Sequence, residues 1–286
     1  MTTVGVVSPG AMGSAMANAL TRGGARVVAT VATRSKRTAQ LADRARIELL
    51  PDLAAVVREA DFVVSIVPPE AASAVAEDVQ HAAREQAVSP LFADLNAIAP
   101  ARVLRIEAVA AEARLEVVDG SISGPPPWKA GTTRVYLSGS RAQEIAALPF
   151  DGVDLIVVGS EVGSASAVKM STASVYKGST ALLLQALRAA DANGVLEHVL
   201  ADLRTASPEL VTDVARRLAS AAAKSGRYVA EMREIAATQS AAGLTPTLFE
   251  AIAKLYCTIA ESELAASSPD EIPQGLELSE VLDRLR

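Results

Sequence analysis

The residues whose types and spacing most suggest chemistry form a glycine-containing turn near the start of the chain. This run, from Val7 to Gly13, follows a short apolar segment and leads into a stretch rich in alanine and methionine. In a dinucleotide-binding turn, one glycine lets the backbone approach a diphosphate and the next lets the helix pack on the strand. Gly10 and Gly13 fit these roles, whereas Ser8 stands where the first glycine is expected. The residues assigned to the dinucleotide site are Gly10, Ala11, Met12 and Gly13.

Basic and hydroxyl residues follow the second apolar segment. An acid at this point would bind the ribose hydroxyl of NAD, whereas basic side chains there bind the additional phosphate of NADP. Residues 30–37 contain no acid, and the next acid along the chain is Asp43. We therefore predict NADP(H) as the cofactor, with contacts from Thr33, Arg34, Ser35 and Arg37. The alternative is a solvated basic helix start, which equal affinity for NADPH and NADH would reveal.

Two more strand ends carry residues suited to ligands, because doubly wound sheets bind ligands beyond the carboxyl ends of their strands. Val67 is the last residue of one predicted strand, and Pro68 follows and ends it there. Asn96 follows the next strand and is suited to bind the nicotinamide ribose or a substrate. Its alternative role is to start the helix that follows. We assign all three residues to the cofactor site, and Asn96 to the substrate site as well.

Lys169 lies among small and apolar residues near the start of a long predicted helix. A charge is costly in such surroundings, and burial lowers the pKa of a lysine toward the range that suits proton transfer. In combination with the glycine turn, Lys169 is the predicted general acid or base. The alternative is a lysine that faces solvent.

A sheet is needed to position these residues. Runs rich in valine and isoleucine alternate with helix-like segments in the first half of the chain, which is typical of strand-helix-strand units around a buried parallel sheet. The predicted strands are 3–7, 27–31, 62–67, 91–94, 115–118, 134–137 and 155–158, and the helices between them are 12–21, 36–45, 53–59, 69–84 and 101–113. The predicted fold class is α/β, with an N-terminal Rossmann-type doubly wound sheet followed by an all-α C-terminal domain.

The second half of the chain has a helical pattern throughout. Residues 162–192 contain no proline and predict one helix of about thirty residues, closed by Asn193-Gly194. Further helices are predicted near 195–203, 208–224, 227–241 and 247–266, with a short one from Ser279. We predict an NADP-binding Rossmann domain over 1–159 and a helical substrate and dimerisation domain over 160–286.

Composition excludes several other classes of protein. The chain of 286 residues has 27 Lys+Arg against 33 Asp+Glu, a net charge of −6, which disfavours binding to nucleic acid. Apolar runs stay shorter than the roughly 18 residues of a membrane span, and the N-terminus enters an apolar strand at once, so we expect a cytoplasmic protein. A single cysteine, Cys257, and two histidines, His81 and His198, do not suggest a disulfide or a metal site.

The order of these segments resembles the β-hydroxyacid dehydrogenase superfamily, which includes 3-hydroxyisobutyrate and 6-phosphogluconate dehydrogenases. Met12-Gly13 matches the Met-Gly pair of its glycine turn. The residues from Asp119 to Pro125 resemble its substrate segment Asp-x-Pro-Val-Ser-Gly-Gly, with the poorest match at Pro125. The resemblance implies that Ser123 and Gly124 hold an acid group of the substrate. The alternative is a stiff loop rich in glycine and proline that covers the sheet edge.

The superfamily's catalytic stretch, Gly-x-Gly-x-x-x-Lys-x-x-x-Asn, aligns with the residues from Gly163 to Ala173, and Lys169 falls on its lysine. Ala165 replaces the second glycine, and Ala173 replaces the asparagine. Tyr176 and Lys177, about two helical turns beyond Lys169, are therefore candidates to orient the substrate.

The C-terminal half most resembles a branch whose helical domain has no assigned function. Residues 227–236 resemble the family's Lys-Asp-Leu helix, with Ala230 at its lysine position and Glu231 at its acid position. The long helix also carries a stripe of small residues, for which the resemblance implies a homodimer and the alternative is a partner helix in the same chain. The stripe comprises Ala167, Ser171, Ser174, Gly178 and Ala181.

The leading hypothesis is an NADPH-dependent oxidoreductase that interconverts a small β-hydroxy acid, or a related hydroxy compound, and its carbonyl form. Lys169 would act as general acid and base. A sugar-phosphate acid is a further substrate option, with Lys177, Arg227 and Arg233 as candidate contacts. An imine reductase or reductive aminase is the alternative enzyme, although such enzymes usually carry Asp or Tyr at the lysine position. A non-catalytic NADPH-binding protein is the alternative of another class, favoured by the departures at Ser8, Ala173 and Ala230.

Overall fold

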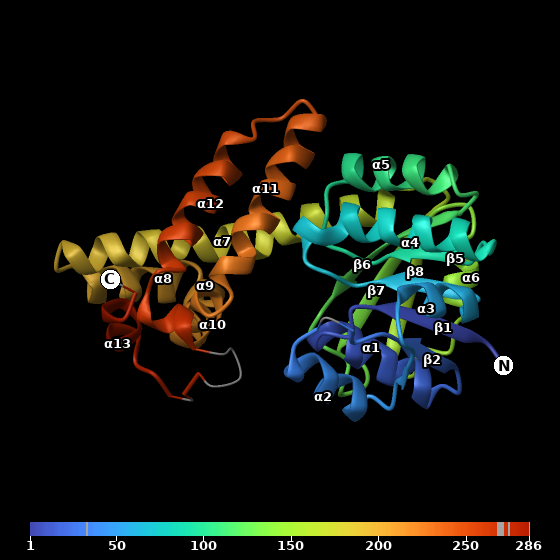
Figure 1. Ribbon diagram of the computed structural model, residues 1–286. Coiled ribbons are helices and arrows are strands. Elements are labelled where there is room, and N and C mark those ends of the chain that lie inside the picture. The colour runs from blue at the N-terminus through green and yellow to red at the C-terminus, as the bar shows by residue number, and fades with distance from the viewer. Residues whose placement is uncertain (33, 268–271, 274, 286) are drawn as a thin grey trace. The chain divides into compact units, whose positions relative to one another are not determined.

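The computed structural model describes residues 1–32, 34–267, 272–273 and 275–285 (Figure 1). The chain forms two compact units, Met1–Met170 and Ser171–Arg286. The first unit contains all the strands described, and the second is helical. The domain boundary expected after residue 159 stays a prediction.

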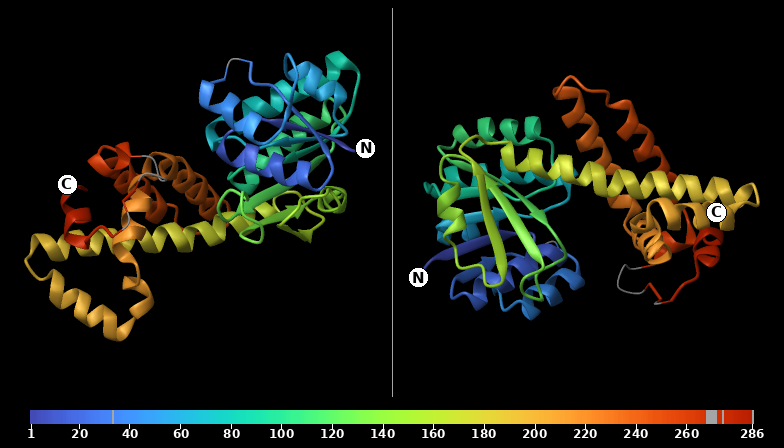
Figure 2. Two further views of the ribbon diagram at one scale, coloured as in Figure 1. Left: turned by 90° about the horizontal axis from the view of Figure 1, so that it is seen from below. Right: turned by 180° about the vertical axis from the view of Figure 1, so that it is seen from behind.

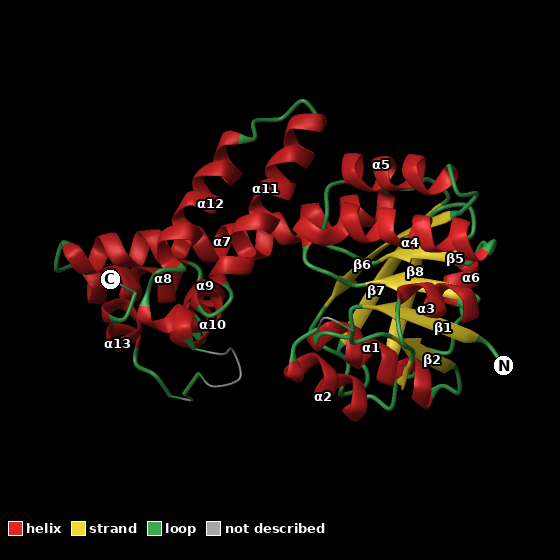
Figure 3. Ribbon diagram, viewed as in Figure 1, coloured by secondary structure: helices red, strands yellow, loops and turns green. Residues whose placement is uncertain are grey.

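The first unit is built on one sheet of eight strands in the order β3-β2-β1-β4-β5-β6-β7-β8 (Figure 3). Neighbouring strands run parallel except for β6 and β7, which are antiparallel. This arrangement confirms the predicted Rossmann-type doubly wound sheet. The strands are β1 (Thr3–Val7), β2 (Arg26–Ala29), β3 (Glu48–Leu49), β4 (Phe62–Ser65), β5 (Leu91–Asp94), β6 (Val117–Ser123), β7 (Thr133–Ser138) and β8 (Val153–Gly159).

Strand β6 is longer than the sequence indicates. The sequence predicts that the strand ends at Val118, but it continues through the polar motif segment to Ser123. This segment has little β propensity of its own, and its backbone is held in the sheet by pairing with β7, with Ser121 opposite Tyr136. Gly120 leaves room for the Leu95 side chain, because a Cβ at this position would overlap one of its methyl groups. Strand β3, which the sequence analysis missed, has only two residues, both exposed.

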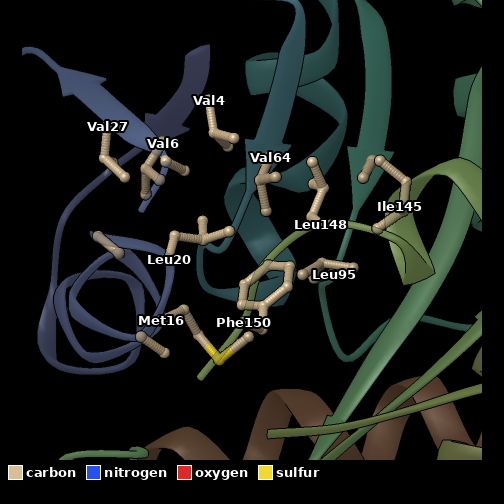
Figure 4. Close-up of a cluster of buried hydrophobic side chains, with 14 of the residues drawn as sticks. Val4, Val6, Met16, Leu20, Val27, Val64, Leu95, Ile145, Leu148 and Phe150 are labelled. Atoms are coloured by element: carbon tan, nitrogen blue, oxygen red, sulfur yellow. The ribbon is translucent and has the colours of Figure 1, made fainter. Parts of the chain in front are cut away.

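Helices cover both faces of the sheet (Figure 1). One face packs against α1 (Ala11–Arg22), α2 (Lys36–Arg44) and α6 (Ala142–Ala146), and the other against α3 (Leu53–Glu59), α4 (Ala72–Gln86) and α5 (Pro100–Ala111). A short 3-10 turn, η1 (Pro69–Ala71), precedes α4. In the first layer Met16 and Leu20 of α1 pack among Val4, Val6 and Phe150 (Figure 4). Burial of each such side chain contributes about 1.5–3 kcal/mol, which fixes the start of α1 over the sheet.

The second unit consists of helices around its own core. The long helix α7 (Ser164–Ala192) crosses the boundary between the units and ends before Gly194, whose φ of +69° fits the predicted helix stop. The other helices are α8 (Leu196–Ala206), α9 (Pro208–Val211), α10 (Val214–Ala222), α11 (Ser225–Ala241), α12 (Thr247–Ile259), η2 (Glu263–Ala266) and α13 (Leu278–Asp283) (Figure 2). The helix predicted over 208–224 is therefore two helices, and the one over 247–266 ends in a separate 3-10 turn.

The small-residue stripe of α7 meets α12 at one point. A Cβ on Gly178 would lie 3.6 Å from a Phe249 ring atom and 3.8 Å from a Ile252 methyl, so α12 packs directly on this glycine. At Gly178 the partner is thus a helix of the same chain. In the part of the chain that the structure describes, no helix is both long and apolar enough to cross a membrane.

Candidate functional site

The first turn of α1 is open. Gly10 is the N-cap residue and supplies no side-chain cap, and the backbone N–H groups of Ala11, Met12 and Gly13 have no hydrogen-bond partner among the described residues. These groups carry the positive end of the helix dipole, so they can receive an anion.

The backbone of the turn explains its glycines. Ser8 takes the left-handed conformation, with φ +65°, and its carbonyl oxygen accepts from Gly10 N at 2.8 Å. A Cβ on Gly13 would lie 2.5 Å from that same carbonyl oxygen, so the protein itself requires glycine there. Gly10 has an ordinary φ of −71°, and a Cβ there would meet no described atom within 4 Å. Glycine at position 10 therefore keeps the space beside the open turn clear, which fits the close approach of a diphosphate.

A basic cluster surrounds the start of α2. Ser35 is the N-cap residue, and its Oγ accepts from Thr38 N at 3.2 Å. Arg34, Lys36 and Arg37 are exposed and form no ion pair with any described residue. Cations at a helix N-terminus are unfavourable by about 0.3–1 kcal/mol each, so an anion bound here would relieve their repulsion. The predicted contact at Thr33 lies outside the described residues.

Asn96 is buried and joins the ends of two strands. Its Oδ1 accepts from Val67 N at 2.6 Å, and its Nδ2 donates to Ser65 Oγ at 3.1 Å and to Asp94 Oδ2 at 2.8 Å. It does not start α5, whose N-cap residue is Ala99. The side chain therefore fixes the loop of Val67 and Pro68 at the carboxyl end of β4. Contact of Asn96 with a ribose or a substrate stays a prediction.

Two buried carboxylates lie side by side beneath this edge of the sheet. Asp94 of β5 pairs in register with Asp119 of β6. Burial raises the pKa of Asp94 to about 7, and the hydrogen bonds from Asn96 oppose this rise. Burial also raises the pKa of Asp119, against the effect of its hydrogen bonds from Ser166, Ser138 and Gly163.

Asp119 holds the start of α7, a role that the sequence analysis missed. Its Oδ2 accepts from Gly163 N at 3.0 Å and Ser166 N at 2.9 Å, and its Oδ1 accepts from Ser166 Oγ at 2.6 Å. Ser138 of β7 donates to the same carboxylate at 3.1 Å and accepts from Ala165 N at 3.0 Å. In contrast with α1, the first turn of α7 is therefore capped from within the protein.

Lys169 lies one turn beyond this anchor. Its side chain is half-buried, and its Nζ donates to Ile122 O of β6 at 2.7 Å. The next residue is Ser123, whose hydroxyl has no hydrogen-bond partner within the described chain. Gly124 follows with φ +120°, and a Cβ there would lie 2.4 Å from Thr132 O, so the turn at the end of β6 requires glycine. The structure thus brings Lys169 to the main chain of the predicted substrate segment.

The two candidates further along α7 have different surroundings in the helical unit. Tyr176 is 67% exposed. Lys177 pairs with the buried Glu231 of α11, and its Nζ lies 4.4 Å from the centre of the Tyr228 ring. Tyr256 of α12 donates to Lys177 O at 2.9 Å. Lys177 is thus bound to the residue at the acid position of the resembled helix, a pairing that its sequence separation conceals.

Among the described residues, no group of three or more His, Cys, Asp or Glu is placed to hold a metal ion.

The sheet and the open helix start define a Rossmann-type dinucleotide-binding protein. The family model described as the NAD binding domain of 6-phosphogluconate dehydrogenase matches residues 3–150. The chain therefore belongs to the β-hydroxyacid dehydrogenase superfamily, a group of NAD(P)-dependent oxidoreductases. A second model, described as a domain of unknown function (DUF1932), matches residues 190–259 and agrees with the expected branch.

The chain is also similar to individual proteins. An uncharacterized 28.5 kDa protein of Methanothermus fervidus is 26% identical over 229 residues, 80% of this chain and 87% of its own. A solved conserved protein of unknown function, described as similar to 3-hydroxyacid dehydrogenases, is 27% identical with a TM-score of 0.70, over 91% of this chain and 97% of its own.

Two further solved structures show the fold alone, because both are only 22% identical. The 3-hydroxyisobutyrate dehydrogenase of Mycobacterium tuberculosis, solved with L-serine, has a TM-score of 0.71 over 100% of this chain and 99% of its own. An imine reductase of Myxococcus stipitatus in complex with NAD+ has a TM-score of 0.58 over 100% of this chain and 99% of its own.

Proposed function

We propose that this protein is an NADPH-dependent oxidoreductase that interconverts a small β-hydroxy acid, or a related hydroxy compound, and its carbonyl form. One observation carries the proposal: the Lys169 ammonium donates to Ile122 O, directly before Ser123 with its available hydroxyl. A proton donor on α7 and a candidate acid-binding group on β6 thus lie beside each other in a dinucleotide-binding unit. The cytoplasmic location expected from the sequence is part of the same proposal.

The nicotinamide cofactor supplies or accepts the hydride when it is bound. The open first turn of α1 would hold its diphosphate, with Gly10 and Gly13 allowing the close approach. Arg34, Ser35 and Arg37 would bind the additional phosphate of NADP at the start of α2. The absence of any acid from residues 30–37 supports NADP over NAD, since no carboxylate there would accept from the ribose hydroxyl.

The chain's own part in the reaction is positioning and proton transfer. In reduction the Lys169 ammonium would give its proton to the substrate oxygen, and in oxidation its amine would take the hydroxyl proton. The hydrogen bond from the Nζ to Ile122 O helps to hold the amine beside the predicted substrate segment. The Ser123 hydroxyl and the main chain around Gly124 would bind the acid group of the substrate, which supports an acidic substrate.

A homodimer is also part of the proposal. One face of α7 in the helical unit is exposed and uncharged, and it includes Val175 and Leu182, which are 64% and 72% exposed. Ser179 and Ala186 extend this face at helical spacing. A second copy would bury it. Sedimentation at micromolar concentration should show a dimer that Leu182→Glu dissociates, and a wild-type monomer would contradict the proposal.

The main experiment compares wild type with Lys169→Met. Both proteins are incubated with NADP⁺ and a panel of β-hydroxy acids, including phosphorylated ones, while the absorbance of the reduced cofactor is followed. Turnover should fall about 10²–10⁴-fold in the variant, the usual contribution of a general acid or base, with NADPH affinity nearly unchanged. Equal turnover in the two proteins would remove Lys169 from its role.

The same panel separates the alternatives. If the hydroxy acids give no turnover, amines, imines and carbonyl compounds are tested next with the matching cofactor form. Turnover of imines alone would replace the proposal by an imine reductase. Tight NADPH binding without turnover of any compound would favour a non-catalytic binding protein.

A further inference from the structure

We propose that Asp119 is a positioning residue that sets the register of α7 on β6 and thereby places the Lys169 ammonium beside Ser123. The catalytic consequence rests on the proposed function, whereas the placement of Lys169 can be measured without it.

The first support is the number of donors that converge on one carboxylate. Asp119 is fully buried and accepts four hydrogen bonds, from two main-chain N–H groups of the α7 start and from two serine hydroxyls. A carboxylate is the only side chain of this size that accepts on both oxygens. An asparagine would carry no charge and would accept on one side only, and an alanine would leave all four groups without their acceptor.

The second support is the geometry of the strand. Alternate side chains of a strand lie on one face, so Asp119, Ser121 and Ser123 of β6 share a face. Asp119 binds the helix at Ser166, and Ser121 Oγ donates to Ala165 O at 2.8 Å. The third member of the row is the hydroxyl proposed to bind substrate. One strand therefore carries both the anchor of the helix and the ligand contact.

The third support is the short path from the anchor to the amine. Ser166 and Lys169 are three residues apart on α7 and so lie on neighbouring positions of one helix face. A shift of the helix start would move the Nζ away from Ile122 O, its contact on the same strand. Misplacement of a reacting group by about 1 Å costs about 10²-fold in rate.

The test measures the exposure of the Lys169 amine by competitive acetylation with acetic anhydride, quantified for each lysine by mass spectrometry in the free protein. In Asp119→Asn the Lys169 rate should rise about tenfold, because the amide loses the negative charge that strengthens all four hydrogen bonds of the anchor and its NH2 group accepts none of them. The rate at exposed Lys129, on the loop between β6 and β7, should stay the same and serves as the internal reference. An unchanged Lys169 rate would overturn the proposal.

A matched control separates positioning from general loss of stability. Ile145→Val removes one methyl from a buried hydrophobic cluster on the other face of the sheet, and no residue of α7 belongs to this cluster. It should lower the melting temperature and leave the Lys169 rate unchanged. If Asp119→Asn does not fold, Ser166→Ala serves as the second variant. It removes only the 2.6 Å hydrogen bond from Ser166 Oγ to Asp119 and should still raise the Lys169 acetylation rate about twofold. A Lys169 rate that rises equally in Ile145→Val would contradict the proposal.

Kinetics on any substrate found by the panel completes the test. Asp119→Asn should lower kcat about 10–100-fold and leave the NADPH Kd within about twofold, since the open turn of α1 is untouched. Different results would contradict the two proposals. Full turnover in Lys169→Met would contradict the acid–base role of that lysine. An unchanged acetylation rate of Lys169 in Asp119→Asn would contradict only the positioning role of Asp119.

Discussion

Helices α1 and α7 begin in opposite ways. The first turn of α1 offers three N–H groups that no described residue satisfies, and Gly10 keeps the space beside them clear. At the start of α7, Asp119 and Ser138 receive the N–H groups instead. The same feature of a helix, its positive end, thus serves ligand binding in one place and the placement of a side chain in the other.

Removing the internal cap should have the largest effect on stability. Asp119→Ala leaves buried N–H and hydroxyl groups without an acceptor, and we expect the free energy of unfolding of the Rossmann unit to fall by about 3–5 kcal/mol. Trp128, the single tryptophan, lies in this unit, so its fluorescence during urea unfolding reports the change. A loss below about 1 kcal/mol would show that water or other groups satisfy these donors equally well.

The two helix starts also differ in how far the sequence predicts them. The α1 turn could be predicted because its glycines, its strand and its helix are contiguous. The α7 cap could not, because Asp119 precedes its partners Gly163 and Ser166 by 44 and 47 residues. Pairing of Ser121 with Tyr136 of β7 is also a contact between separate segments, so a local pattern ends the strand too early.

Contacts between residues far apart in the sequence also escape prediction in the helical unit. Helical periodicity predicts most of its helices, but the pairing of Lys177 with Glu231 joins α7 to α11 and depends on how these helices pack. Lys169 was predicted from its type and its surroundings, whereas its contact with Ile122 O required the register of α7 on β6.

The pH dependence of stability tests Asp94, the buried carboxylate that lies beside Asp119 in the sheet. The pKa of Asp94 is raised from the ordinary value of 3.8 to about 7 by burial. Between these pH values the folded protein binds more protons than the unfolded chain, so stability falls as the pH rises. We expect a loss of about 3 kcal/mol between pH 5 and pH 8 in urea unfolding. A shallower profile in Asp94→Asn than in wild type would assign this part of the slope to Asp94, with the remainder due to Asp119, whose pKa burial also raises; equal slopes would refute the role of Asp94.

Substitution at the open first turn of α1 should change the affinity for the cofactor and leave stability nearly unchanged. Gly10→Ala adds a Cβ that meets no described atom within 4 Å, so the melting temperature should change little. NADPH affinity should fall about 10–100-fold, because the methyl group occupies the space that a diphosphate needs. Gly13→Ala is the matched contrast: its Cβ would lie 2.5 Å from Ser8 O and should lower stability as well. Unchanged affinity in Gly10→Ala, measured by fluorescence titration, would show that this turn does not approach the cofactor.

The smallest expected effect concerns the basic start of α2. This helix N-terminus is intermediate between the uncapped start of α1 and the fully capped start of α7. Ser35 caps it weakly from within, and the charges of Arg34, Lys36 and Arg37 remain for an external anion. Arg34→Ala should weaken NADPH binding about tenfold and leave NADH binding unchanged, because only NADPH carries the additional phosphate. Arg105→Ala on α5 removes the same charge from an exposed position elsewhere and should change neither affinity. Equal losses for both cofactors in Arg34→Ala would mean that this cluster acts through general attraction of anions, and the choice of NADPH over NADH would then lie elsewhere in the chain.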